Sequence, residues 1–285
     1  MSRGPALRSF WKRHTLGTIG IAILAIAVGC ALAAPLIAPY SPTAISLLAR
    51  MKPPFWLEGG SFAHPLGTDN LGRDMLSRVI YGSRISLAVG FAAVLMGAAI
   101  GTTVGILAGY FGGWIDSILS FLIDVQLSFP FTLLAIFLLA TLGGGFWPIV
   151  CVLALATWVN YARVVRGQVM SIRSQDYVEA ARTVGVQTRR ILTRYILPNT
   201  VSSIIVVASF SMAQAILTEA ALSFLGVGVD GSNPSWGTML NDGRNYLQTA
   251  WWLTAMPGVA IALTVLGGNL CGDWLQDHFD PRLAR

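Results

Sequence analysis

The chain carries little charge for its length. Only 11% of its 285 residues are Asp, Glu, Lys or Arg, whereas soluble globular proteins carry about 25%. Hydrophobic residues make up 54% of the sequence, and the mean hydropathy is +0.65. This composition argues against a soluble globular protein, and it predicts a polytopic membrane protein.

Sequence patterns of catalytic and metal sites are also missing. Cys30, Cys151 and Cys271 each stand alone in apolar stretches, which favours small buried side chains over a disulfide framework or a metal site. The three histidines are isolated, and no G-x-x-x-x-G-K-[ST], H-E-x-x-H or G-x-S-x-G stretch occurs. We therefore predict no catalytic residue, no metal and no cofactor bound by this chain.

The net charge of +6 does not indicate nucleic-acid binding, because the basic residues lie at the edges of apolar runs, where they set membrane orientation. The first apolar run resembles a signal peptide with an Ala31-Leu32-Ala33 cleavage site. The run from Leu16 to about Ala38 is longer than a signal-peptide core and long enough to span a bilayer. We expect it to be retained as the first span.

Hydropathy predicts six membrane spans, at about 16–38, 85–109, 115–142, 146–163, 200–225 and 251–272. Continuous apolar runs of this length are helices, because lipid offers the backbone no hydrogen-bond partner. The expected fold is an all-α polytopic membrane protein. Four basic residues before the first span favour a cytoplasmic N-terminus, and counting through the spans places the C-terminus on the same side.

One loop conflicts with this orientation. Residues 39–84 would lie outside, yet they hold five basic residues, which the positive-inside rule disfavours there: Arg50, Lys52, Arg73, Arg78 and Arg84. We divide the chain into residues 1–84, with the N-terminal tail, the first span and an extracytoplasmic amphipathic segment, and a core of residues 85–285. The core has five spans and a cytoplasmic loop at 164–199.

Glycine recurs at every fourth position in the second expected span. On a helix, this spacing puts small residues on one face and lets another backbone approach closely. We predict a helix-packing face made of Gly97, Gly101, Gly105 and Gly109.

Two acidic residues lie inside expected spans. Asp124 is deep in the third span, six residues before Pro130, which can kink the helix. Glu219 is near the outer end of the fifth span, where simple exposure costs little. Charges in hydrocarbon usually pair inside a bundle or line a wet cavity. Both residues are candidates for structural pairing or for lining a translocation path.

A charged stretch interrupts the apolar sequence at residues 176–199. Asp176 and Glu179 have the spacing of a helix N-cap with a capping box, Ala180 and Ala181 continue the helix after Tyr177, and Gly185 is suited to end it. A second helix would begin at the cap Thr188 and run from Arg189 to Leu197. Pro198 would stop that helix, and Asn199 or Thr200 would cap the next span. Composition alone leaves open whether the stretch docks a partner or is a solvated connector.

The residues "EAARTVG" at 179–185, followed by "LPN" at 197–199, resemble the cytoplasmic EAA loop of binding-protein-dependent ABC importer permeases. Further stretches are similar to the C-type subunits (the DppC/OppC group) of the dipeptide, oligopeptide and nickel branch. These are "HPLGTDNLGRDMLSRVIYGSRISL" (64–87), "GILAGYFGGWID" (105–116), "YARVVRGQVMSI" (161–172), "EAALSFLGVGV" (219–229), "PSWGTMLNDGR" (234–244) and "GDWLQDHFDPRL" (272–283).

This resemblance implies a type I ABC importer permease in a bacterial inner membrane. The chain would pair with a B-type permease subunit, two cytoplasmic ATPase subunits would bind ATP and Mg, and an extracytoplasmic binding protein would deliver a short peptide or related solute. The ATPase-coupling residues would be Asp176, Tyr177, Glu179, Ala180, Ala181, Gly185, Arg189, Pro198 and Asn199. The outer segment 64–84 and the outward residues Asp230, Trp236 and Asp242 would lie near the binding protein.

Two other functions remain to be weighed. A secondary transporter could use Asp124 or Glu219 as an ion site, but the hydropathy pattern shows no inverted repeat, and this hypothesis leaves the EAA loop unexplained. An intramembrane enzyme would need a nucleophile and a base, and no such set is visible. An ATP-driven permease subunit that is not itself an enzyme is therefore the favoured hypothesis.

Overall fold

The computed structural model describes residues 4–229 and 233–279, which form a bundle of helices. Short turns η1 (Leu47–Ala49) and η3 (Arg244–Tyr246) lie in its outer loops. The remaining elements, in chain order, are α1 (Gly4–Ile37), α2 (Met75–Phe111), α3 (Gly113–Ser128), α4 (Phe131–Leu142), α5 (Phe146–Arg173), α6 (Asp176–Thr183), α7 (Thr188–Ile191), the π-helical turn η2 (Leu192–Ile196), α8 (Leu197–Phe224), α9 (Trp236–Gly243) and α10 (Trp252–Phe279).

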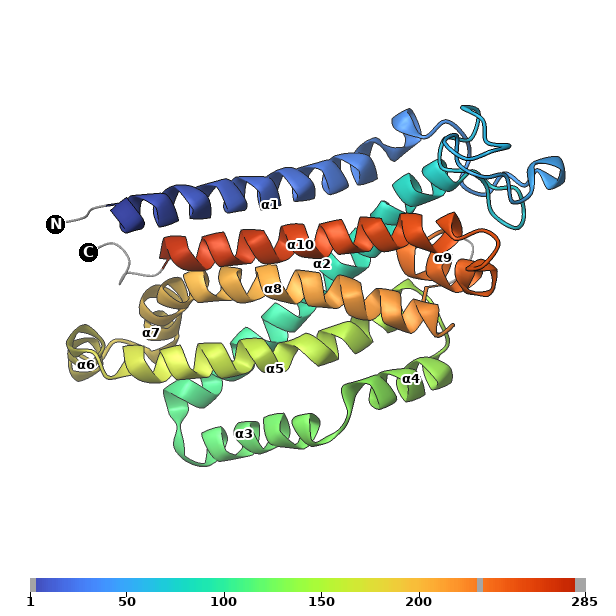
Figure 1. The fold of residues 1–285 in the computed structure, drawn as a ribbon. Coiled ribbons are helices and arrows are strands. Elements are labelled where there is room, and N and C mark those ends of the chain that lie inside the picture. The colour runs from blue at the N-terminus through green and yellow to red at the C-terminus, as the bar shows by residue number, and fades with distance from the viewer. Residues whose placement is uncertain (1–3, 230–232, 280–285) are drawn as a thin grey trace.

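Helices α1, α5, α8 and α10 run roughly along one direction, and α2 crosses them obliquely (Figure 1). In the described part of the chain, five of them are long and apolar enough to cross a membrane, and a sixth crossing is reached when the bent pair α3 and α4 counts as one span. The start of α1, the end of α10 and the short helix α6 lie at the same end of the bundle (Figure 1). The predicted all-α polytopic fold is confirmed.

Helix α2 begins earlier than hydropathy predicts, at Met75 rather than near residue 85. The Asp74 side chain caps it, accepting a hydrogen bond from the backbone N–H of Ser77 at 2.8 Å. The first turns of α2 carry charged side chains that contact polar groups of the outer loop. These charges lower the mean hydropathy, so the predicted span does not include the first turns. The domain boundary expected at residue 84 therefore falls inside a helix. Helix α5 likewise continues beyond residue 163, to Arg173.

The third expected span is broken rather than gently kinked. Helices α3 and α4 meet at 87°. Phe129 between them is extended, with φ −98° and ψ 137°, as expected for a residue that precedes proline. Pro130 is the N-cap of α4, so the proline ends one helix and starts the next.

The predicted glycine face of α2 lies against α5. A Cβ atom added at Gly101 would lie 2.2 Å from the carbonyl oxygen of Trp158, and one at Gly105 would lie 2.7 Å from that of Ala162. Only glycine allows two backbones to approach this closely. Gly97 and Gly109 lie against the next turns of α5 in either direction, with added Cβ atoms 2.1 Å from Thr157 Oγ1 and 2.8 Å from the Arg166 carbonyl oxygen. The two helices are thereby closely packed along residues 97–109 of α2.

Candidate functional site

The short helix α6 protrudes at the end of the bundle, two residues beyond the end of α5 (Figure 1). Its N-cap is Gln175, whose side chain makes no capping hydrogen bond. The expected capping box of Asp176 and Glu179 is therefore wrong. Both residues lie in the first turn, where their carboxylates face the positive end of the helix dipole. Asp176 and Glu179 therefore contribute negative charge at the start of α6, and no side chain caps the first backbone N–H groups of the helix.

Gly185 ends the helix in the way its sequence position predicts. Its φ of +80° is left-handed, and its N–H donates to the carbonyl of Arg182 at 3.0 Å. The N–H of Val186 donates to the carbonyl of Ala181, also at 3.0 Å. These two bonds form a Schellman motif, which needs a residue that tolerates positive φ.

Most of α6 faces outward. Val178 is fully buried against α5 and the segment after α6, while Ala181 is half-buried. Val184, in the C-terminal turn of the helix, is 83% exposed. The remaining exposed residues of this surface are Asp176, Tyr177, Glu179, Ala180, Arg182, Thr183 and Gly185. We call the exposed residues of this helix and its C-terminal turn the α6 face.

Two arginines tie this loop to the inner end of α2. Arg173, the last residue of α5, donates to the carbonyl oxygen of Tyr110 at 2.7 Å. The guanidinium carbon of Arg182 lies 5.4 Å from the centre of the Tyr110 ring, within the range of a cation–π interaction. A displacement of α6 would therefore act on α2 as well as on α5. Local sequence patterns do not indicate Tyr110, because its partners lie more than sixty residues away.

The segment after α6 differs from the expected two-helix arrangement. Thr188 is the first residue of α7 and does not cap it, and Pro198 does not stop the helix. The chain stays helical from Thr188 to Phe224. The wider π-helical turn η2 precedes Pro198, and such turns accommodate a residue that cannot donate a backbone hydrogen bond. Asn199 caps nothing; its side-chain amide donates to the carbonyl of Tyr195 at 2.5 Å.

Arg189 is exposed on α7. Together with Arg190 and Arg194, which are also exposed, it makes the surface beside α6 basic.

Asp124 lies on α3 and is paired across to α5. Its carboxylate is 3.7 Å from the guanidinium of Arg163, and the two side chains are 73% and 56% exposed. A second ion pair joins the same helices nearer the start of α3 and the end of α5. There Arg166 donates from two nitrogens to Asp116, one of them at 2.7 Å. The structural pairing expected for Asp124 exists, but the residue stays exposed on the isolated chain.

Glu219 has structural partners, which is one of the two alternatives that the sequence left open. Its side chain is fully buried rather than exposed near the outer end of its span. Three serine hydroxyls donate to the carboxylate: Ser223 at 2.8 Å, Ser235 at 3.0 Å and Ser86 at 3.2 Å. These serines come from α8, from the N-cap of α9 and from α2, so Glu219 joins three elements and lines no open path in this chain.

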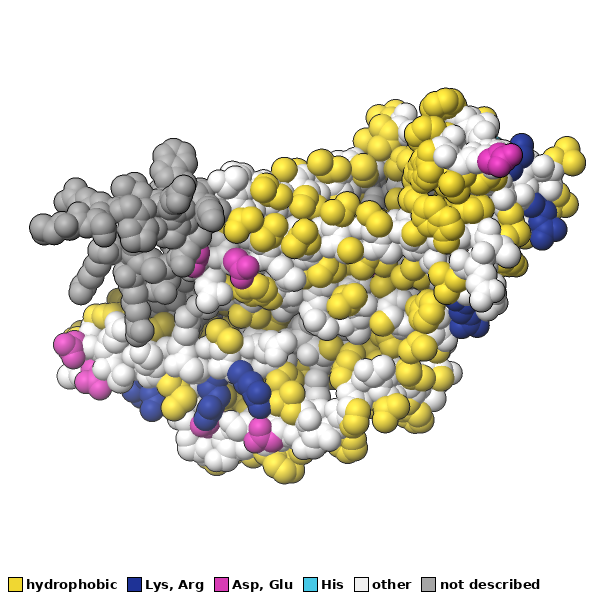
Figure 2. Space-filling model, in the orientation of Figure 1, with side chains coloured by type: hydrophobic (Ala, Val, Ile, Leu, Met, Phe, Trp, Pro, Cys, Tyr) yellow, Lys and Arg dark blue, Asp and Glu magenta, His cyan; other side chains and the backbone are white. Residues whose placement is uncertain are grey.

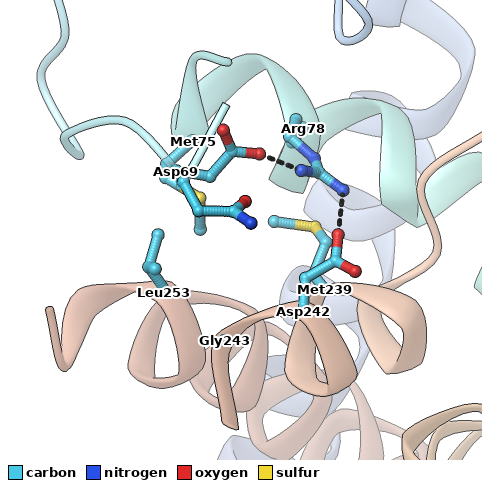
Figure 3. A pocket seen from close by; sticks show the side chains of 8 residues that line it. Asp69, Met75, Arg78, Met239, Asp242, Gly243 and Leu253 are labelled. Atoms are coloured by element: carbon cyan, nitrogen blue, oxygen red, sulfur yellow. Dashed lines mark hydrogen bonds and ion pairs between the residues drawn. The ribbon is translucent and has the colours of Figure 1, made fainter. Parts of the chain in front are cut away.

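The outer loop holds a second polar cluster, shown in Figure 3. Arg78 lies between Asp69 and Asp242, with its guanidinium 3.0 Å from the Asp242 carboxylate. Arg73 donates to Asp69 at 2.6 Å and to Asp242 at 3.2 Å. Arg50 donates to the Asn70 carbonyl at 2.7 Å. Three of the five basic residues that conflicted with the positive-inside rule therefore have structural partners, and two of them, Arg73 and Arg78, connect α9 to the start of α2 and the loop before it.

The outward residues have mixed positions. Trp236, the first residue of α9, is buried, and its ring N–H donates to the Val79 carbonyl at 2.9 Å. Asp230 lies outside the described residues. Within residues 4–229 and 233–279, no three His, Cys, Asp or Glu side chains gather where they could hold a metal ion.

Family comparisons agree with this architecture. A profile described as the binding-protein-dependent transport system inner membrane component matches residues 101–285. A second profile, the N-terminal TM domain of oligopeptide transport permease C, matches residues 6–54.

Similar proteins match over almost the whole chain. The di/tripeptide transport system permease protein DppC of Pseudomonas aeruginosa is 41% identical, over 97% of this chain and 92% of its own length. The glutathione transport system permease protein GsiD of Pectobacterium atrosepticum is 42% identical, over 97% and 91%. Among solved structures, a chain of the inward-facing MetNI methionine ABC transporter matches with a TM-score of 0.58 and 20% identity, covering 70% of this chain and 94% of that chain. This last likeness concerns the fold alone.

Proposed function

Since the chain belongs to the family of binding-protein-dependent transport system inner membrane components, we propose that it forms half of the translocation path of an ATP-driven importer of short peptides. Membership in this family makes it the membrane-embedded, non-catalytic component of an ABC transporter that works with ATPases and a binding protein. It also removes the ion-coupled secondary transporter from consideration. The names of the relatives, which refer to dipeptides, di/tripeptides and glutathione, support a short peptide as the substrate.

The proposed complex has five parts. A B-type permease subunit completes the path, two ATPase subunits bind ATP and Mg beneath it, and a binding protein delivers substrate from outside. This chain itself binds no cofactor. Both its termini and α6 would lie in the bacterial cytoplasm, on the side from which the ATPases act.

The observation that supports this arrangement is the exposure of the α6 face. The helix is anchored by Val178 and by Arg173 and Arg182 at Tyr110, yet its outer surface presents Val184 at 83% exposure. An apolar side chain in this position, flanked by small and acidic residues, fits a groove in a partner protein. We assign the ATPase contact to Tyr177, Glu179, Ala180 and Val184, with Gly185 fixing the turn and Arg189 at the margin.

The test uses the purified complex with its ATPases and loaded binding protein. Glu179→Lys and Gly185→Val should lower recovery of the ATPases in a pull-down, or abolish the hydrolysis stimulated by the binding protein. Asp273→Lys is the matched control, because it reverses an exposed acidic residue in the last third of α10 without touching α6. Recovery of ATPases and stimulated hydrolysis that both match wild type in the α6 variants would refute the assignment.

A further inference from the structure

The polar cluster around Arg78 borders a small cavity, which lies where the loop before α2 meets α2, α9 and the start of α10 (Figure 3). This is the outer end of the bundle, where Figure 2 shows charged side chains at the right of the view. Buried apolar side chains form part of the wall of the cavity: Met75, Met239 and Leu253. The volume of the cavity is about 10 Å³, and one water molecule needs about 10–15 Å³. The cavity therefore has room for one water molecule or one small ion.

Two polar atoms of the residues that line this cavity have no partner among the protein atoms that the structure describes. Arg78 is 4% exposed, and its two terminal nitrogens bind Asp69 and Asp242. Its remaining nitrogen, Nε, is buried without a hydrogen-bond partner, and the same holds for Oδ1 of Asn70. Buried polar atoms in folded proteins are nearly always hydrogen-bonded, either to protein or to ordered water. These two atoms need a partner that the protein does not supply.

Asn70 is held beside the cavity by the turn to which it belongs. Its backbone carbonyl accepts a hydrogen bond from Nε of Arg50 at 2.7 Å. On the same turn, the Asp69 carboxylate accepts from the backbone N–H groups of Leu71 and Arg73, both at 2.9 Å. The backbone around Asn70 is therefore fixed, and its side chain stays close to the cavity.

The charges around the cavity indicate a neutral occupant. The cluster contains two carboxylates and two guanidinium groups, already joined in ion pairs: Asp69, Asp242, Arg73 and Arg78. A cation in the cavity would be repelled by the guanidinium groups, and an anion would be repelled by the carboxylates. The N–H of Arg78 Nε can only donate, and Oδ1 of Asn70 can only accept. A water molecule satisfies both atoms, because it accepts and donates at the same time.

We propose that one water molecule is bound in this cavity as a fixed part of the structure. It accepts a hydrogen bond from Nε of Arg78 and donates one to Oδ1 of Asn70. Its second hydrogen is available to a carboxylate of the cluster, which gives the water the number of bonds that buried waters usually make.

This water connects the turn at residues 69–73 to α2 through the residue that also holds α9, because Arg78 contacts Asp242. The two ends of α9 are therefore held in different ways. Its N-cap Ser235 binds the buried carboxylate of Glu219 directly, whereas its C-terminal end is held by a network that includes the water. This inference concerns the fold of the chain and does not depend on the proposed function.

The first test is a cryo-EM structure of the assembled transporter in lipid nanodiscs, at a resolution that shows ordered waters. We expect a peak at hydrogen-bond distance, about 2.7–3.2 Å, from both Arg78 Nε and Asn70 Oδ1. A map that resolves Met75 and Met239 and shows waters elsewhere, but no peak here, would overturn the proposal. A peak that disappears when choline replaces sodium and potassium would also overturn it, because the occupant is then a cation.

The second test distinguishes a hydrated cavity from a dry one by the direction of a stability change. The purified chain in mixed micelles is unfolded with sodium dodecyl sulfate. In a dry cavity, Asn70→Leu removes a polar atom that has no partner, so the unfolding midpoint should stay equal or rise. In a hydrated cavity, it displaces the water and leaves Nε of Arg78 without an acceptor. We expect a lower midpoint, and an equal or higher one would contradict the bound water. Asn245→Leu, the same change at an exposed residue of η3, is the matched control.

A poor fit of the leucine side chain could also lower the midpoint, and a double-mutant cycle with Arg78→Lys separates the two causes. Lysine keeps the positive charge but has no Nε–H donor at this position. If the water links the two residues, Asn70→Leu should shift the midpoint less in the Arg78→Lys background than in wild type. A steric cost of the leucine would persist in both backgrounds, so equal shifts would refute the link.

Discussion

Replacing Gly101 by alanine should separate α2 from α5. The new Cβ would lie 2.2 Å from the carbonyl oxygen of Trp158 and 2.6 Å from the Cβ of Tyr161, whereas ordinary contacts begin at 3.4 Å. A backbone carbonyl cannot rotate away as a flexible side chain can, so the helices must shift by about 1 Å. Extra volume in a packed core costs about 1–3 kcal/mol. We expect Gly101→Ala to lower the free energy of unfolding by that amount.

Gly167→Ala is the matched control on the facing helix. It makes the same chemical change in the interior of α5, but nothing lies within 4 Å of the added Cβ. Alanine is favoured over glycine in a helix interior by about 0.5–1 kcal/mol. The two substitutions should therefore change stability in opposite directions.

The assay is reversible unfolding of the purified chain in mixed micelles, titrated with sodium dodecyl sulfate and followed by far-ultraviolet circular dichroism. Gly101→Ala should unfold at a lower detergent fraction than wild type, and Gly167→Ala at an equal or higher one. If Gly101→Ala is as stable as wild type, the close approach of α2 and α5 is not a constraint on the fold, and the packing argument fails.

Two further predictions concern single buried or bridging groups. Glu219→Leu should lower the free energy of unfolding by about 1–3 kcal/mol in the same titration, because the hydroxyls of Ser86, Ser223 and Ser235 lose their shared acceptor. Glu219→Gln should lower it by less. A leucine variant as stable as wild type would contradict this expectation. Tyr110→Leu should reduce the ATP hydrolysis stimulated by the binding protein several-fold, while the ATPases still bind. Tyr110→Phe keeps the aromatic ring under Arg182 and should behave as wild type. Equal hydrolysis in the two variants would exclude a role for the ring.

Much of the architecture follows from local sequence. A long apolar run must form a helix in lipid to satisfy its backbone hydrogen bonds, so the number of membrane crossings and the all-α fold class are predictable. The glycine repeat of α2 and the left-handed turn at Gly185 are also local properties, set by residue spacing and by backbone freedom. These features need no knowledge of what lies opposite.

The roles that the sequence left unresolved depend on contacts distant in sequence. Glu219 could be expected to be exposed because of its position near a helix end, and only the approach of α9 buries it. Arg78 looked like an unfavourable charge on the outer side, and its partner Asp242 lies 164 residues away. A charged side chain destabilises or stabilises the fold depending on whether it has a partner. Local sequence does not reveal a partner that is distant in the chain.

Helix boundaries at prolines fail for a related reason. Pro130 and Pro198 each lack a donor, yet α3 breaks at the first while the chain stays helical through the second. At Pro198 the preceding π-helical turn widens the backbone, and Asn199 donates to the Tyr195 carbonyl one turn before it. Phe129 before Pro130 has no such arrangement and becomes extended. A proline alone therefore does not decide where a helix ends, and the backbone conformation of the residues before it does.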